Sequence, residues 1–152
     1  FCRALNDVTT RLVKMMASDG EGASTMIECA VSGAPDIQAA RCISKTVISS
    51  DLFKAAIFGG DANWGRILCA VGYAPVDFNA DHIDVALASD NGRVTVCRRS
   101  SHAAFSEAEA ADILDAPEIR VEINLNQGEA EATAWGCDLT YEYVKINGDY
   151  RS

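Results

Sequence analysis

The first part of the chain changes from a helical to a strand-like hydrophobic pattern. Apolar residues recur three and four positions apart over residues 1–18, which predicts an amphipathic helix. These residues are Phe1, Leu5, Val8, Leu12, Met15 and Met16. Two closely spaced glycines in residues 19–22 then predict a turn. Residues 25–31 alternate as a strand does, with one side formed by Thr25, Ile27, Cys29 and Val31.

Helical patterns occupy the next segment. Residues 32–36 predict a loop that leads into a second helix, with Pro35 in the first turn and Asp36 adding a favourable charge there. The apolar stripe of this helix consists of Ile37, Ala40, Ile43, Val47 and Ile48. Residues 51–58 are short and apolar and end at two glycines. Residues 63–71 predict a third helix, whose apolar residues are Trp64, Ile67, Leu68 and Val71.

Hairpin signals dominate the second half. Residues 82–88 and 93–98 alternate on either side of Asp90-Asn91-Gly92, which is a strong hairpin turn. Ser106, with Glu109 three positions later, predicts a capped helix over residues 106–114.

Residues 118–125 and 129–136 predict a second hairpin around Asn126-Gln127-Gly128, and residues 139–149 fit a helix or a strand. No repeat or linker divides the 152 residues. The element order predicts one α+β unit, in which a mixed or antiparallel sheet is layered with helices.

Composition excludes several classes of protein. Apolar residues make up 49% of the chain, enough for a buried core. No apolar run approaches the roughly 20 residues that span a bilayer, so no membrane association is expected. With 22 acidic and 13 basic residues, the formal charge of -9 argues against nucleic acid as a partner.

The cysteines and histidines point to neither a metal nor a redox site. The six cysteines include no C-x-x-C pair, which favours reduced, buried thiols and a cytoplasmic location. His82 and His102 are far apart, with no metal-ligand pattern between them. We therefore expect no metal, and no G-x-S-x-G or H-E-x-x-H motif occurs.

Two polar loops stand out from core patterning. Glu21 lies between two glycines, which would let the backbone approach a ligand while the carboxylate meets an ammonium group or takes a proton. Spacing alone favours the alternative, a helix-ending turn whose acidic residues face water. In residues 58–66, Asp61, Asn63 and Arg66 crowd among glycines, and helix capping is slightly favoured there over ligand contact.

Two further segments lie near the C-terminus. Residues 134–141 have the composition of a tightly packed strand end, and Cys137 has no histidine motif to activate it as a nucleophile. Residues 143–152 carry tyrosines and aliphatic residues to the end, which predicts a packed terminus. Asn147 and Ser152 could donate hydrogen bonds to a carboxylate there, or the segment could be purely structural.

The four segments together resemble one enzyme family. The motifs are Asp-Gly-Glu-Gly-Ala at 19–23, Phe-Gly at 58–59, Asp61 with Asn-Trp-Gly-Arg-Ile at 63–67, Ala-Trp-Gly-Cys-Asp-Leu-Thr-Tyr at 134–141 and Tyr-Val-Lys-Ile-Asn-Gly-Asp-Tyr-Arg-Ser at 143–152. In this order they resemble the ornithine acetyltransferases, also called bifunctional glutamate N-acetyltransferases. The resemblance covers nearly the whole chain.

This resemblance implies an enzyme of arginine biosynthesis with the DmpA/ornithine-acetyltransferase-like fold. Members cleave their own precursor and free a Thr at the start of the β chain. That Thr, with its own amine as base, moves acetyl from N-acetylornithine to glutamate through an acetyl-enzyme. An oxyanion hole in the α chain holds the intermediate. The resemblance also implies a cytoplasmic α2β2 heterotetramer without a cofactor, although bifunctional members use acetyl-CoA as a co-substrate.

The chain departs from the family at the nucleophile. It begins at Phe1, which suggests a cut by processing or design, and it contains no Ala-Thr-Met-Leu-like cleavage motif. Thr9 and Thr10 lie within a helical pattern. We therefore expect residues 1–152 to be the C-terminal portion of the β chain, without a catalytic residue and inactive alone. Its partners would be the α chain and the Thr-bearing segment of the same precursor, and exposed apolar surface would mark where that segment docks.

What carries over is a substrate-binding set. Glu21, Asn147 and Ser152 match the binding positions of the family, whereas Asp61, Asn63 and Arg66 match a motif for which we expect an architectural role. Thr25 stands where the family commonly has Lys. Two alternatives stay open: an N-terminal-nucleophile aminopeptidase of similar fold, against which the terminal motif argues, and a non-catalytic small-molecule-binding or structural subunit.

Overall fold

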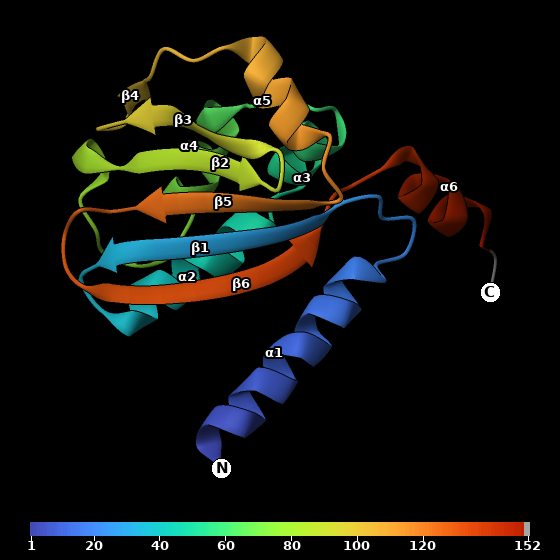
Figure 1. The fold of residues 1–152 in the computed structure, drawn as a ribbon, viewed down its shortest axis with the longest axis horizontal. Helices are drawn as coiled ribbons and strands as arrows, with labels where there is room; N and C mark the ends of the chain where they lie inside the picture. Colours follow the sequence, from blue (N-terminus) through green and yellow to red (C-terminus); the bar gives the residue numbers. More distant parts are fainter. Residues whose placement is uncertain (151–152) are drawn as a thin grey trace.

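A six-stranded mixed sheet organises residues 1–150, the part of the chain that the computed structural model describes. In chain order the elements are α1 (Cys2–Ser18), β1 (Met26–Ala34), α2 (Ile37–Ile48), α3 (Asp51–Phe58), α4 (Trp64–Gly72), the 3-10 helix η1 (Ala80–His82), β2 (Asp84–Ser89), β3 (Gly92–Arg98), β4 (Ser101–His102), α5 (Glu107–Leu114), β5 (Glu118–Asn124), β6 (Ala130–Cys137) and α6 (Tyr141–Asp149). The strand order is β4-β3-β2-β5-β1-β6, and only β1 and β5 run parallel (Figure 1). The predicted α+β class is confirmed.

Polar caps fix where the helices begin. The Asp36 side chain accepts a hydrogen bond from the Ala39 amide at 2.8 Å and so caps α2. Ser106 caps α5 as predicted, through the Glu109 amide. Two local predictions at the start of α2 were wrong. Residues 32–34 continue β1 across an irregularity in pairing rather than forming a loop, and Pro35 precedes the cap instead of lying in the first turn.

One of the two predicted hairpins forms. β2 and β3 pair across Asp90-Asn91, as expected. The second predicted hairpin was wrong, because β1 lies between β5 and β6: Ile27 is paired with Ile119 in parallel and with Gly136 in antiparallel register. A central strand can satisfy the hydrogen-bonding groups of its backbone only with a neighbour on each edge. The connection through residues 125–129 therefore crosses the end of β1 instead of making a tight turn.

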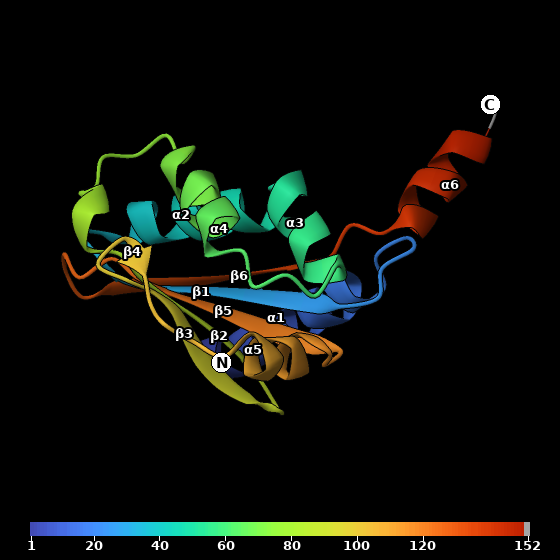
Figure 2. The ribbon, with the colours of Figure 1, turned by 90° about the horizontal axis from the view of Figure 1, so that it is seen from above.

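Helices cover the two faces of the sheet unequally. Figure 2 shows α2, α3 and α4 together on one face and α1 and α5 on the other. The first face holds much of the core, where Ile27 on β1, Ile43 on α2 and Phe53 on α3 are at most 1% exposed. In the predicted apolar stripe of residues 37–48, Ala40, Ile43 and Val47 are buried and Ile48 is partly buried, whereas Ile37 is 48% exposed. No helix within residues 1–150 is long and apolar enough to cross a membrane.

The two terminal helices bury none of their residues. α6 is a helix, which resolves the ambiguity of residues 139–149, but it projects away from the sheet (Figures 1 and 2). The prediction of a packed terminus was therefore wrong for residues 143–150, where an apolar composition does not coincide with burial. α1 forms as predicted and leaves much of its apolar stripe in solvent, with Leu5 51% and Met16 76% exposed.

The six cysteines are free thiols in different environments. Cys29 and Cys97 are buried, whereas Cys2 and Cys69 are exposed, so the prediction that most of the thiols are buried was wrong. Apolar neighbours in sequence did not place these two residues inside. Burial, with the negative charge of Glu28 beside it, raises the pKa of the Cys29 thiol to about 12, which keeps it protonated and unreactive.

Candidate functional site

Two of the three predicted binding residues meet although they lie 126 positions apart. The Asn147 amide Nδ2 donates a hydrogen bond to Glu21 Oε2 at 2.7 Å. It also donates to the Tyr143 carbonyl at 2.9 Å, one turn earlier on α6. Both Glu21 and Asn147 are exposed, as a residue that meets an incoming ligand must be. The third predicted residue, Ser152, lies outside the described residues.

The turn that carries Glu21 requires its second glycine. Gly22 adopts φ +67°, a conformation that side chains with a Cβ rarely adopt. A Cβ at Gly22 would lie 2.7 Å from the amide nitrogen of Tyr143, in the first turn of α6. Glu21 is therefore held against the start of the helix that carries Asn147. The backbone at this turn approaches α6 closely, and the expected approach to a ligand stays a prediction.

A single residue begins α6 and binds the Glu21 turn. Thr140 is 6% exposed, and its hydroxyl accepts a hydrogen bond from the Tyr143 amide at 3.3 Å as the helix cap. The same hydroxyl donates to the Gly22 carbonyl. Thr140 therefore both fixes the Glu21 turn and starts α6.

The contacts of the polar loop at residues 58–66 join and cap helices. Asn63 Oδ1 accepts from the Arg66 amide at 3.0 Å and caps α4, while Asn63 Nδ2 donates to Asp61 at 3.0 Å. Arg66 Nη1 donates to the Leu52 carbonyl at 2.9 Å, joining α4 to α3. Only the start of this loop reaches the site, where the rings of Phe58 and Tyr141 meet edge to face at 5.4 Å.

A groove of about 490 Å³ lies beside the Glu21 turn. Its lining includes Ser24, Phe58, Gly59, Gly60, Leu114 and Pro117. These residues come from three separate parts of the sequence, two of which were singled out by their motifs. Ser24, three residues after Glu21, is the part of the turn region that lines the groove, and both polar and apolar residues form its walls.

The described residues near Glu21 include groups that can form hydrogen bonds with an amino acid. A carboxylate and an amide can accept from an ammonium and donate to a carboxylate, respectively. Cys137 lies beneath the turn, where its Sγ would be 2.5 Å from a Cβ at Gly20, but the histidines are elsewhere. His102 packs against Trp64 and Phe105 near β4, at the end of the sheet opposite α6 (Figure 1). Within residues 1–150 no group of three or more metal-binding side chains gathers.

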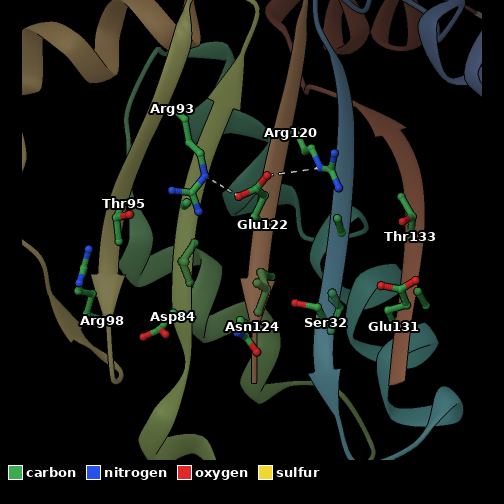
Figure 3. A pocket seen from close by; sticks show the side chains of 16 residues that line it. Ser32, Asp84, Arg93, Thr95, Arg98, Arg120, Glu122, Asn124, Glu131 and Thr133 are labelled. Atoms are coloured by element: carbon green, nitrogen blue, oxygen red, sulfur yellow. Dashed lines mark hydrogen bonds and ion pairs between the residues drawn. The ribbon is translucent and has the colours of Figure 1, made fainter. Parts of the chain in front are cut away.

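A larger polar hollow lies on the sheet face that carries α1 and α5, and sequence reasoning missed it. It has a volume of about 750 Å³ (Figure 3). Arg93 Nε lies 2.8 Å from Glu122 Oε2, and Arg120 Nε lies 3.7 Å from the other oxygen of Glu122. Charged residues at every second position of β5 were the available signal. Charges of both signs line the hollow, and two of its arginines pair with Glu122.

A second charge cluster anchors α1 to the sheet. Lys14 Nζ lies 2.8 Å from Glu28 Oε2, and Trp135 Nε1 donates to the same oxygen at 2.7 Å. Burial alone would raise the pKa of Glu28, but the hydrogen bonds from Lys14 and Trp135 and the charges of Lys14 and Arg120 outweigh it, so the pKa lies below its ordinary value. The cluster fixes the helix that leads directly into the Glu21 turn.

Known proteins match this chain closely in sequence and in fold. The sequence pattern of the ArgJ family matches residues 1–152. The chain is 47% identical over all its residues to arginine biosynthesis bifunctional protein ArgJ 1 of Clostridium acetobutylicum, and 48% identical to the ArgJ protein of Caldanaerobacter subterraneus subsp. tengcongensis. It covers 37% and 38% of those relatives. The crystal structure of the Bacillus halodurans ArgJ protein superimposes with a TM-score of 0.91 at 43% identity, over 97% of this chain and 68% of that one.

The mixed sheet and its helices define an α+β domain, which matches the fold of a solved ArgJ protein. The chain belongs to the ArgJ family. The family resemblance predicted from the sequence is therefore confirmed. The chain spans a little over a third of the length of the curated relatives it matches.

Proposed function

We propose that residues 1–152 are the C-terminal portion of the β chain of an ornithine acetyltransferase of arginine biosynthesis. The complete enzyme transfers acetyl from N-acetylornithine to glutamate and yields ornithine and N-acetylglutamate. The observation that carries the proposal is the 2.7 Å contact between Glu21 and Asn147, because it joins two motifs from opposite ends of a chain that matches ArgJ proteins throughout.

In the proposed reaction this chain binds the amino acid, and a Thr outside it does the chemistry. The Thr hydroxyl, deprotonated by its own amine, attacks the acetyl carbonyl; the C–N bond of N-acetylornithine breaks and ornithine leaves with a proton. The amine of glutamate then attacks the acetyl ester, and the Thr oxygen leaves and regains its proton. Glu21 receives the substrate ammonium, and Ser152 donates to the substrate carboxylate. Asn147 donates to that carboxylate only when it gives up its hydrogen bond to the Tyr143 carbonyl, because the two N–H donors of its amide are used by Glu21 and Tyr143. One contact with Asn147 leaves Glu21 acceptor capacity, since a carboxylate has about four lone-pair positions.

The remainder of the precursor is the proposed partner. The exposed apolar stripe of α1, including Leu5, Val8 and Leu12, supports this, because soluble proteins rarely leave such a helix face uncovered. The α chain and the Thr-bearing segment would cover it in a cytoplasmic α2β2 heterotetramer. We propose no cofactor, although bifunctional members of the family use acetyl-CoA as a co-substrate. We also propose no nucleic-acid partner and no membrane partner.

A pair of isosteric variants tests the binding role in the complete enzyme. Glu21→Gln removes the charge that receives the ammonium while keeping the side-chain volume. We expect the KM for N-acetylornithine to rise by about tenfold or more, which corresponds to about 1.4 kcal/mol of lost binding. Glu129→Gln is the matched control, because Glu129 is exposed just before β6 begins, at the end of the strand away from α6. Equal KM values in both variants would contradict the proposal.

A further inference from the structure

Asp138 is a buried carboxylate immediately after β6. It is 3% exposed, whereas the aspartates of ordinary surface loops face water. Its Oδ1 accepts from the Ser24 amide at 2.9 Å, and its Oδ2 accepts from the Ser24 hydroxyl. Its own amide donates to the Thr25 carbonyl at 3.0 Å. A buried carboxylate is costly unless it is hydrogen-bonded, so these contacts fix Ser24 firmly.

Asp138 and Thr140 hold the Glu21 turn at two points. Asp138 binds Ser24, three residues after Glu21, and Thr140 binds the Gly22 carbonyl. Thr140 also caps α6, the helix that places Asn147. The segment 138–140 thus sets the position of the turn relative to α6, and with it the distance between the two binding side chains.

We propose that Asp138 is a positioning residue for the amino-acid substrate. This inference rests on the proposed function and extends it. Asp138 does not touch the substrate; it acts through Ser24 to keep the Glu21 carboxylate where the substrate ammonium arrives. Its loss therefore weakens binding and leaves the attack by the Thr outside this chain unchanged, so KM rises while kcat stays constant. A purely structural aspartate would lower thermal stability without changing KM.

The test compares four variants of the complete enzyme by steady-state kinetics. Asp138→Ala removes both acceptors, and we expect the KM for N-acetylornithine to rise by about tenfold with kcat unchanged. Asp138→Asn keeps one acceptor for the Ser24 amide and should raise KM by about threefold. Ser24→Ala keeps the carboxylate and loses one donor, so it should behave like Asp138→Asn. Asp112→Asn, exposed on α5, is the control and should match the wild type.

Coupling to Glu21 separates positioning from general stability. In the double variant Glu21→Ala/Asp138→Ala, KM should equal that of Glu21→Ala alone, because the side chain that Asp138 positions is already gone. A raised KM in Glu21→Ala with a wild-type KM in Asp138→Asn and Ser24→Ala would overturn the inference and leave the proposed function standing, as would fully multiplicative effects in the double variant. A wild-type KM in Glu21→Ala would overturn both. If Asp138→Ala does not fold, Asp138→Asn and Ser24→Ala decide alone.

Discussion

Replacing Glu28 by Gln should destabilise the protein in a pH-dependent manner. Glu28 is 16% exposed at its side chain and accepts from Lys14 and Trp135, which hold its pKa below the ordinary value. A glutamine can still accept from Trp135, so the main losses are the ion pairs with Lys14 at 2.8 Å and with Arg120 at 3.5 Å. Hydrogen bonds to charged groups contribute about 1.5–3 kcal/mol. Lys14 is 41% exposed and solvent screens it, which reduces the expected loss to about 1 kcal/mol.

The sign of the pH dependence follows from the lowered pKa. A carboxyl whose pKa is lower in the folded state stabilises the protein above its unfolded pKa, and this stabilisation disappears as the pH falls through the folded value. The difference between wild type and Glu28→Gln should therefore be full at pH 7 and shrink below about pH 4.

Urea unfolding at pH 7 and below about pH 4, followed by tryptophan fluorescence, measures this difference. Glu129→Gln is again the control, because it removes an exposed charge at the far end of β6. A loss of equal size at both pH values, or none at pH 7, would refute the reasoning that the Glu28 charge anchors α1 to the sheet.

Two further predictions concern the glycine turn and the thiols. Gly22→Ala should lower the free energy of unfolding by about 1–3 kcal/mol, because the left-handed backbone disfavours a Cβ and the Cβ would clash with the Tyr143 amide. Gly72→Ala is the control and should not lower it, since a Cβ there meets open space. Equal effects of the two variants in urea unfolding would contradict this prediction. Exposed Cys69 should be alkylated by iodoacetamide in the folded protein, and buried Cys29 only after unfolding. Peptide mass spectrometry detects both products, and rapid modification of Cys29 in the folded protein would contradict this prediction.

Local signals in the sequence predicted most of the individual elements. Helix spacing, the Ser106 cap and the Asp90-Asn91-Gly92 turn each act over a few residues, so the pattern contains them. The insertion of β1 between β5 and β6 could not be predicted in this way. Pairing partners more than 90 positions apart leave no local trace, and the Asn126-Gln127-Gly128 turn signal was compatible with either arrangement.

In the candidate site, too, local motifs identified single residues but not the contacts between distant parts of the chain. Glu21 and Asn147 were singled out by motif, and the structure adds their contact. Asp138 was inside a quoted motif without a role, because a carboxylate next to a strand end looks exposed in sequence. The Lys14–Glu28–Trp135 cluster was missed, since it joins a helix to two strands 107 residues apart. Apolar residues in α6 suggested packing, but the helix projects into solvent.

Reconstitution of acetyl transfer tests most directly whether this chain binds an amino acid without attacking it. The assay follows transfer from N-acetylornithine to isotopically labelled glutamate by the 152-residue chain alone, by the remainder of its precursor alone, and by the two coexpressed. We predict that only the coexpressed material turns over, and that its intact mass includes a polypeptide with an N-terminal Thr. Turnover by the chain alone, proven free of the remainder, would contradict the proposal.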